Sequence, residues 1–89
     1  MPTLVTQHRV KDYPTWRPHF DQHENKRVEY GITNPRVYRN ANDLNDLLLL
    51  FNVSDEARAK EFGQSDDLRN VMEAAGVEMS TCSMKILPD

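Results

Sequence analysis

Three histidines are the residues of this 89-residue chain best suited to chemistry: His8, His19 and His23. Histidine is the side chain whose ordinary pKa lies nearest neutrality, so it can accept or release a proton at physiological pH. His19 and His23 are four residues apart, which on a helix makes them neighbours and a workable pair of metal ligands. No cysteine or glutamate stands at a matching third position, so we expect no metal site and interpret His19 as a surface residue.

His23 shares a helical face with aromatic residues. Trp16, Phe20 and His23 recur at steps of three and four residues, and this spacing predicts that one face of a helix carries all three. The face should pack against a sheet, with Trp16 and Phe20 forming the wall of a cavity that binds substrate. The same face continues through Arg27 and Tyr30.

His8 belongs to an alternating segment, on the side of a strand that also carries Leu4 and Val10. If this side of the strand meets the helix, His8 and His23 come close together. His23 would then act as the general base and His8 would set its tautomer, or the two rings would satisfy each other or hold a water molecule. The alternative is a pair of core histidines with a purely structural role.

Tyr38 and Asn40 form a second candidate pair for binding substrate. On a strand they share one face, from which a phenol and an amide could orient a carbonyl or phenolic ligand. The alternative is that Tyr38 lies in a dimer interface and that Asn40 is the amide of a turn.

Composition excludes several classes of protein. The formal charge is −3, with acidic and basic residues mixed along the chain, so nucleic acid is not an expected partner. The longest apolar run, residues 47–51, is too short to cross a membrane, and the chain shows no secretory signal pattern. The one cysteine, Cys82, offers no disulfide or zinc motif. We therefore expect a cytoplasmic protein.

Strand-like and helix-like segments alternate through the whole chain, which we interpret as a single domain, residues 1–89. The order is β-α-β-β-α-β, with the second helical region broken in two. This is the ferredoxin-like arrangement of the α+β class, with a four-stranded antiparallel sheet. The predicted strands are residues 3–10, 35–40, 46–53 and 77–87, and the predicted helices are residues 15–30, 55–63 and 66–75.

Local residues set these boundaries. Thr15 is predicted to cap the first helix, because Pro18 then lies in the first turn, where its missing N–H costs no hydrogen bond. Gly31 ends that helix. Residues 40–45 are rich in asparagine and aspartate and predict a tight hairpin loop.

The apolar run at residues 47–51 also bears on assembly. A strand with one wet face alternates apolar and polar residues, whereas this run is apolar at both parities. Helices can cover one face of the sheet only. A second copy of the chain is the simplest way to cover the other face of the sheet. This predicts a homodimer in which the two sheets pack face to face.

Three stretches of sequence carry a resemblance to a known group. They are the pattern Asp12-Tyr13-x-x-Trp16-x-Pro18-x-Phe20-Asp21-x-His23-Glu24, the run 36–41 followed by Asp43-x-Asn45, and Ser65-x-x-Leu68-Arg69-x-x-Met72-x-x-Ala75-Gly76-Val77. Together they resemble small bacterial proteins of the dimeric α/β-barrel superfamily, near the antibiotic biosynthesis monooxygenase-like proteins. The resemblance implies a cavity between helices and sheet. It also implies chemistry such as cofactor-independent oxygenation of polyphenols, lactone isomerisation or polyketide cyclisation.

We therefore expect a homodimer that binds a small planar ligand, phenolic or lactone-like, without a tightly bound cofactor. As an enzyme it would be a monooxygenase, an isomerase or a cyclase, with His23 and His8 as the catalytic pair. The residues expected to bind substrate are Trp16, Phe20, Tyr38 and Asn40. The alternative is a ligand-binding or dimerisation module without catalysis.

Overall fold

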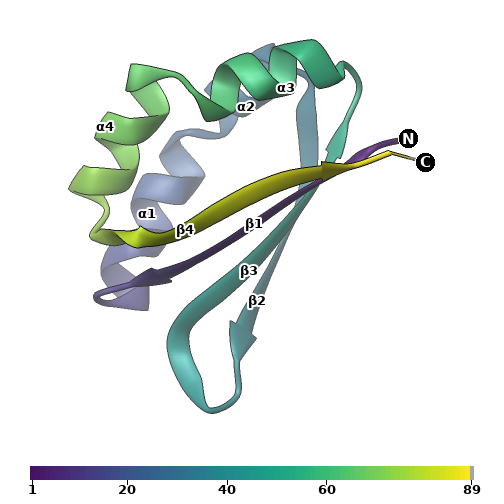
Figure 1. The fold of residues 1–89 in the computed structure, drawn as a ribbon. Helices are drawn as coiled ribbons and strands as arrows, with labels where there is room; N and C mark the ends of the chain where they lie inside the picture. Colours follow the sequence, from purple (N-terminus) through teal and green to yellow (C-terminus); the bar gives the residue numbers. More distant parts are fainter. Residues whose placement is uncertain (89) are drawn as a thin grey trace.

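The computed structural model describes residues 1–88 and shows four strands and four helices within them (Figure 1). The strands are β1 (Thr3–Val10), β2 (Ile32–Asn40), β3 (Asp43–Val53) and β4 (Val77–Leu87). The helices are α1 (Tyr13–Gln22), α2 (Glu24–Glu29), α3 (Glu56–Gly63) and α4 (Asp66–Ala74).

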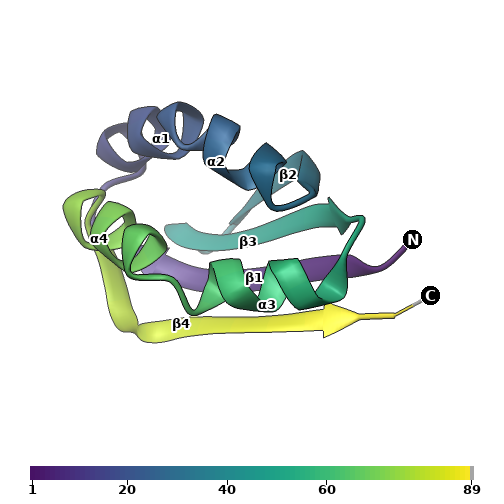
Figure 2. The ribbon, with the colours of Figure 1, turned by 90° about the horizontal axis from the view of Figure 1, so that it is seen from above.

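The strands form one sheet in the order β2-β3-β1-β4, with every neighbouring pair antiparallel. All four helices lie against one face of this sheet, and the other face carries no helix (Figures 1 and 2). This architecture confirms the predicted ferredoxin-like α+β fold. None of the helices in the described residues has the length and apolar character that crossing a membrane requires.

The core lies between the sheet and the helices. Alternation along β1 sends Leu4, Thr6, His8 and Val10 inward, and all four are buried. On β3 the inward set consists of Leu47, Leu49, Phe51 and Val53.

The first helix differs from its prediction in two ways. It begins at Tyr13 rather than at Thr15, because the Asp12 carboxylate caps it and accepts a hydrogen bond from the Thr15 N–H. Pro18 therefore lies inside α1 rather than in its first turn. The predicted single helix is also broken at His23, which ends α1 and precedes α2.

Strands β2 and β3 are longer than predicted and leave only Ala41 and Asn42 between them. Asn40 stabilises this turn, since its side-chain oxygen accepts a hydrogen bond from the Asn42 N–H at 2.9 Å. Gly31, which comes before β2, has φ +74°, a backbone conformation that glycine adopts without strain.

Both outer strands of the sheet are irregular. A step of two positions on β1, from Gln7 to Arg9, corresponds to a step of five positions on β4, from Ser83 to Glu78, so β4 bulges beside His8. On β2 the register shifts between Thr33 and Arg36, around Asn34 with φ 53° and Pro35.

Candidate functional site

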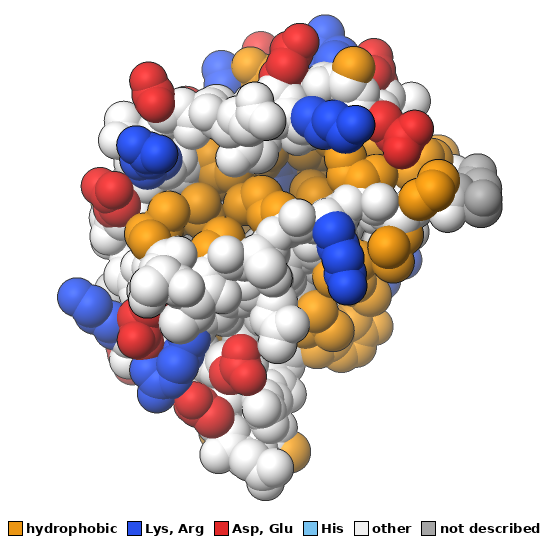
Figure 3. Space-filling view, in the orientation of Figure 1, with side chains coloured by type: hydrophobic (Ala, Val, Ile, Leu, Met, Phe, Trp, Pro, Cys, Tyr) orange, Lys and Arg blue, Asp and Glu red, His pale blue; other side chains and the backbone are white. Residues whose placement is uncertain are grey.

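A cavity lies between the sheet and the helices, and its wall is almost entirely apolar. All four strands contribute to its floor, β1 and β3 most of all, and all four helices contribute to its roof. Figure 3 shows hydrophobic side chains exposed in the hollow between the helices and β4. The free space inside it is about 50 Å³, enough for a few water molecules and well below the ~300 Å³ usual for drug-sized ligands.

His8 is the most unusual polar group in this cavity. The residue is 3% exposed, and neither ring nitrogen has a hydrogen-bond partner in the structure. Burial lowers the pKa of His8 to about 4, although the Asp46 carboxylate opposes part of this shift. His8 is therefore neutral at pH 7. One of its nitrogens then carries a proton and the other is a free acceptor.

Aromatic rings continue from His8 along one wall of the cavity. The His8 ring meets Trp16 edge-on, with centroids 6.0 Å apart. Trp16 stacks on Phe20 at 4.8 Å, and Phe20 lies 6.1 Å from Phe51 on β3. These contacts make this side of the cavity aromatic and apolar.

Arg27, on α2, is the one buried cation among the residues that line the cavity, and it is 5% exposed. Its Nη1 donates to the Phe20 carbonyl at 2.8 Å, and the guanidinium lies 3.9 Å from the Phe20 ring centroid. Burial lowers the pKa of Arg27, with Glu24 and Asp21 acting in the opposite direction. The sequence analysis placed Arg27 on the aromatic helix face but gave it no role. Its position seven residues after Phe20 was the signal that the two side chains would lie on the same side of the helices.

His23 lines the cavity but does not bond to His8. Its Nε2 lies 2.8 Å from the Asp67 carboxylate, and an ionised carboxylate only accepts, so Nε2 carries the proton. This bond lowers the pKa of Asp67. Neither nitrogen of His8 has a hydrogen-bond partner, so His8 and His23 do not bond to each other. The predictions that the two rings satisfy each other and that His8 sets the tautomer of His23 are therefore wrong. Asp67 sets that tautomer.

Four of the six predicted site residues meet at the cavity: His8, Trp16, Phe20 and His23. Tyr38 and Asn40 lie outside it. Tyr38 is 52% exposed and pairs with Leu48 in the sheet, on the face away from the helices. The Asn40 amide donates to Asp46 in the hairpin.

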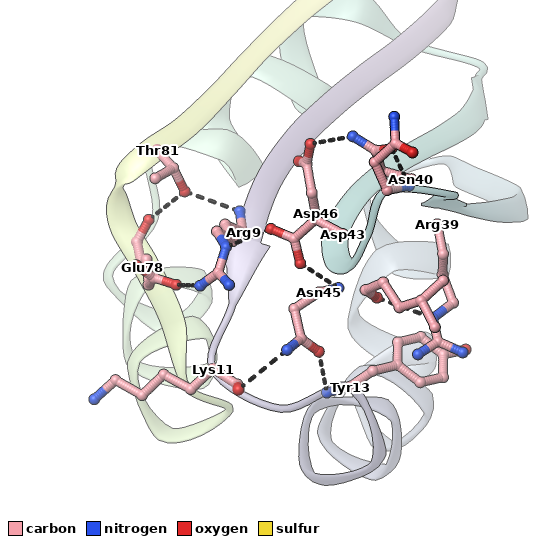
Figure 4. A network of polar contacts seen from close by, with 12 residues as sticks. Arg9, Lys11, Tyr13, Arg39, Asn40, Asp43, Asn45, Asp46, Glu78 and Thr81 are labelled. Atoms are coloured by element: carbon pink, nitrogen blue, oxygen red, sulfur yellow. Dashed lines mark hydrogen bonds and ion pairs between the residues drawn. The ribbon is translucent and has the colours of Figure 1, made fainter.

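Asn45 positions the aromatic helix, a role that the sequence did not reveal (Figure 4). From β3, its side-chain oxygen accepts from the Tyr13 N–H at 3.0 Å and its amide donates to the Lys11 carbonyl at 3.4 Å. Both bonds fix the turn between β1 and α1.

Arg9 links three strands at the neighbouring end of the sheet. From β1 it forms ion pairs with Asp43 on β3, at 2.7 Å, and with Glu78 on β4.

Met84 separates the cavity from two larger hollows outside it. It contributes to the cavity wall, to a groove of about 380 Å³ between α3 and β4, and to a hollow of about 260 Å³ below the start of α4. Methionine has three rotatable side-chain bonds and adapts readily to neighbours.

Histidine, cysteine and acidic residues do not gather into a metal-binding group of three or more anywhere in residues 1–88. His23 is engaged by Asp67, and His19 does not line the cavity.

No family model matches the chain, and no curated protein matches it. Among solved structures, a protein from Bordetella bronchiseptica provisionally designated an antibiotic biosynthesis monooxygenase superposes with a TM-score of 0.77 at 10% identity, over 99% of this chain and 95% of that one. A second structure designated an antibiotic biosynthesis monooxygenase gives a TM-score of 0.71 at 12% identity, over 100% and 98%. SnoaB, a cofactor-independent oxygenase from Streptomyces nogalater, gives 0.72 at 13% identity, over 99% and 91%.

These matches run the full length of the chain, and they confirm the resemblance seen in the sequence at the level of the fold. The identities are too low to carry an activity or a substrate from those proteins to this one, because a fold hosts many unrelated reactions. A function has to be argued from the cavity itself.

Proposed function

We propose that this protein is a small-molecule enzyme that removes a proton from a planar phenolic or lactone-like substrate, as a cofactor-independent monooxygenase or as an isomerase. One observation carries the proposal: His8, buried in an aromatic cavity, has two ring nitrogens without partners. A buried polar group left unpaired costs free energy. A ligand that bonds to His8 recovers that cost, and this gives the cavity a defined polar contact.

His8 is a better candidate for the base than His23. The Nε2 of His23 is already bonded to Asp67, whereas His8, which also lines the cavity, has an acceptor nitrogen without a partner. The His8 nitrogen takes the proton, and the electron pair stays on the substrate as an enolate or phenolate. Because the pKa of His8 is about 4 in the unliganded protein, the transfer needs the developing anion beside the imidazolium to stabilise it.

Two outcomes follow from the same anion. In isomerisation the proton returns to a different carbon, and no other reactant is needed. In oxygenation the co-substrate is O₂: a methylene carbon becomes a carbonyl with one oxygen atom, and its two hydrogens leave with the other oxygen as water. SnoaB, which has this fold, is described as a cofactor-independent oxygenase, and this supports the second outcome.

The test measures proton removal directly. Anthrone and α-angelica lactone are incubated with the protein in D₂O without oxygen, and NMR follows exchange of their acidic C–H for deuterium. We expect His8→Gln to slow exchange at least tenfold, since glutamine cannot accept the proton. His19→Gln, which changes a histidine outside the cavity, should leave the rate unchanged. Ligands that bind to the protein without exchanging would instead support a binding module.

We also propose that the protein acts as a homodimer through the face of the sheet that carries no helix. Tyr38 is 52% exposed and Leu48 36% exposed on this face, with the partly exposed Val5 and Leu50 beside them. Figure 3 shows hydrophobic side chains gathered on this side of the sheet. Such a patch is the kind of surface that associates.

Leu48→Asp is expected to convert the dimer to a monomer, because it buries an unpaired carboxylate at the centre of the contact. Analytical ultracentrifugation across a concentration series measures the shift. Val28→Asp is the matched control, since Val28 is 53% exposed on α2, away from the sheet. A wild-type protein that stays monomeric at the highest concentration would contradict the dimer.

A further inference from the structure

Sulfur-containing side chains gather around one hollow outside the His8 cavity. This hollow has a volume of about 260 Å³ and lies below the start of α4. Three of the chain's four methionines and its one cysteine line it: Met72, Met79, Cys82 and Met84. The reaction proposed for His8 uses none of these sulfur atoms.

The bulge in β4 brings three of these residues to the same hollow. Cys82 and Met84 are two positions apart, about 7 Å along the strand, so they share a face. Met79 is three positions from Cys82, and a regular strand would point the two side chains to opposite faces. Both line the hollow because the register of β4 shifts between Glu78 and Ser83. Bulges re-aim side chains in this way, often beside functional sites.

Met72 reaches the hollow from α4, which lies over the start of β4 (Figures 1 and 2). Met72 is buried, and the half-buried Cys82 and Met84 pack against the core. The Met84 sulfur lies against Gly63, where a Cβ atom would be only 3.4 Å from it, so the missing side chain of Gly63 makes room for this sulfur. Because thioether side chains are flexible, those from α4 and β4 can converge on one small ligand.

The residues around the hollow suit a soft, monovalent metal ion. Thiolate and thioether sulfur select Cu(I), whereas Mg²⁺, Ca²⁺ and Mn²⁺ are bound by oxygen ligands. Among the described residues, no aspartate, glutamate or histidine lines this hollow, and the guanidinium of Arg69, which does, disfavours a divalent cation. A thiolate at Cys82 would cancel the single charge of Cu(I), so the complex places no net charge in a half-buried site.

We propose that Met72, Cys82 and Met84 bind one Cu(I) ion in this hollow, with Met79 as a fourth sulfur ligand. The site goes beyond the proposed function and shares only the walls at Met72 and Met84 with the His8 cavity. Burial raises the pKa of the Cys82 thiol, so the metal has to displace its proton. A bond forms between the Cys82 sulfur and copper, the proton leaves to water, and no electron is transferred. The expectation of no metal site considered histidine, cysteine and glutamate and left methionine out.

Anaerobic titration of the full chain with Cu(I), in competition with the chelator bicinchoninate, tests the proposal. We expect the wild type to hold one Cu(I) per chain. Cys82→Ser should weaken binding at least a hundredfold, since it removes the thiolate. Met72→Leu and Met84→Leu should each weaken it at least tenfold, because leucine keeps an apolar side chain of similar size without sulfur. His19→Gln, which removes an imidazole away from the hollow, should leave the affinity unchanged.

Two further measurements keep the test independent of the stability of the variants. Circular dichroism without copper establishes that each variant is folded, and Cu(I) should raise the melting temperature of the wild type but not that of Cys82→Ser. X-ray absorption at the copper edge, on the wild type alone, should show sulfur neighbours only.

Three results would overturn the inference. If Cys82→Ser abolishes binding while Met72→Leu and Met84→Leu bind as the wild type does, copper sits on an isolated thiol. If nitrogen neighbours dominate the absorption spectrum, the ion is bound at histidine instead. If bicinchoninate removes all copper from the wild type, the hollow holds no copper site. The exchange assay for His8 is measured without copper, so each of these results leaves the proposed function standing.

Discussion

Acidification from pH 6.5 to pH 4 is expected to lower the free energy of unfolding by about 3 kcal/mol through His8 alone. The pKa of His8 falls from 6.5 in the unfolded chain to about 4 in the folded protein. Below pH 6.5 the unfolded chain therefore binds a proton that the folded protein does not accept until about pH 4. The contribution of His8 to the free energy of unfolding is fully present above pH 6.5, the pKa in the unfolded chain. It declines between pH 6.5 and about pH 4 and changes little below that.

Urea unfolding at half-unit steps of pH, at fixed protein concentration, measures this slope. His8→Leu removes the titrating ring and keeps an apolar side chain of similar size, so its stability should change far less between pH 6.5 and pH 4. Asp43 and Asp67 also have lowered pKa values, but their contribution is lost only below about pH 3.8. Parallel curves for wild type and His8→Leu over the upper window would show that His8 is not held neutral by burial.

Replacement of Trp16 by alanine is expected to cost about 3–5 kcal/mol of stability, the range typical of removing a large buried aromatic side chain. Trp16 is 2% exposed and contacts Tyr13, Phe20 and His8. Its loss removes the centre of the aromatic wall and leaves a cavity that α1 cannot close without moving. For a domain of this size the loss is a large fraction of the total stability.

Urea titration followed by circular dichroism is the appropriate measurement, because the variant has no tryptophan to report unfolding. Val28→Ala is the control, since it truncates an apolar side chain that is 53% exposed on α2, away from the sheet, and its cost should be below about 1 kcal/mol. Equal losses for the two variants would mean that the wall around Trp16 is not the organising part of the core.

The bounds of two strands were predictable. Strands β1 and β4 begin and end where predicted, because their apolar residues and flanking turns are plain in the sequence. The first helix was harder. Asp12 competes with Thr15 for the cap, and at the break the Phe20 carbonyl accepts from both the His23 N–H and the Arg27 side chain. No local propensity encodes that tertiary contact.

The site was predictable where it depended on periodicity alone. Helical spacing correctly brought Trp16, Phe20 and His23 to one wall, and strand parity correctly sent His8 toward it. Parity failed for Tyr38. Counting regularly from the inward-facing Ile32 would turn Tyr38 inward as well, but the irregularity around Asn34 reverses the alternation, and Val37 packs on the core instead. A single left-handed residue is not visible in a pattern of apolar spacing.

The irregularities of β2 and β4 also affect how copies of this protein can meet. These two strands are the edges of the sheet, where unpaired backbone groups can recruit strands from other molecules and start fibrous aggregates. Pro35 removes a donor from one edge, and the bulge beside His8 disrupts the hydrogen-bonding ladder of the other. Open-ended growth is thus disfavoured at both edges, while the broad face between them stays available for an assembly that closes at a defined size.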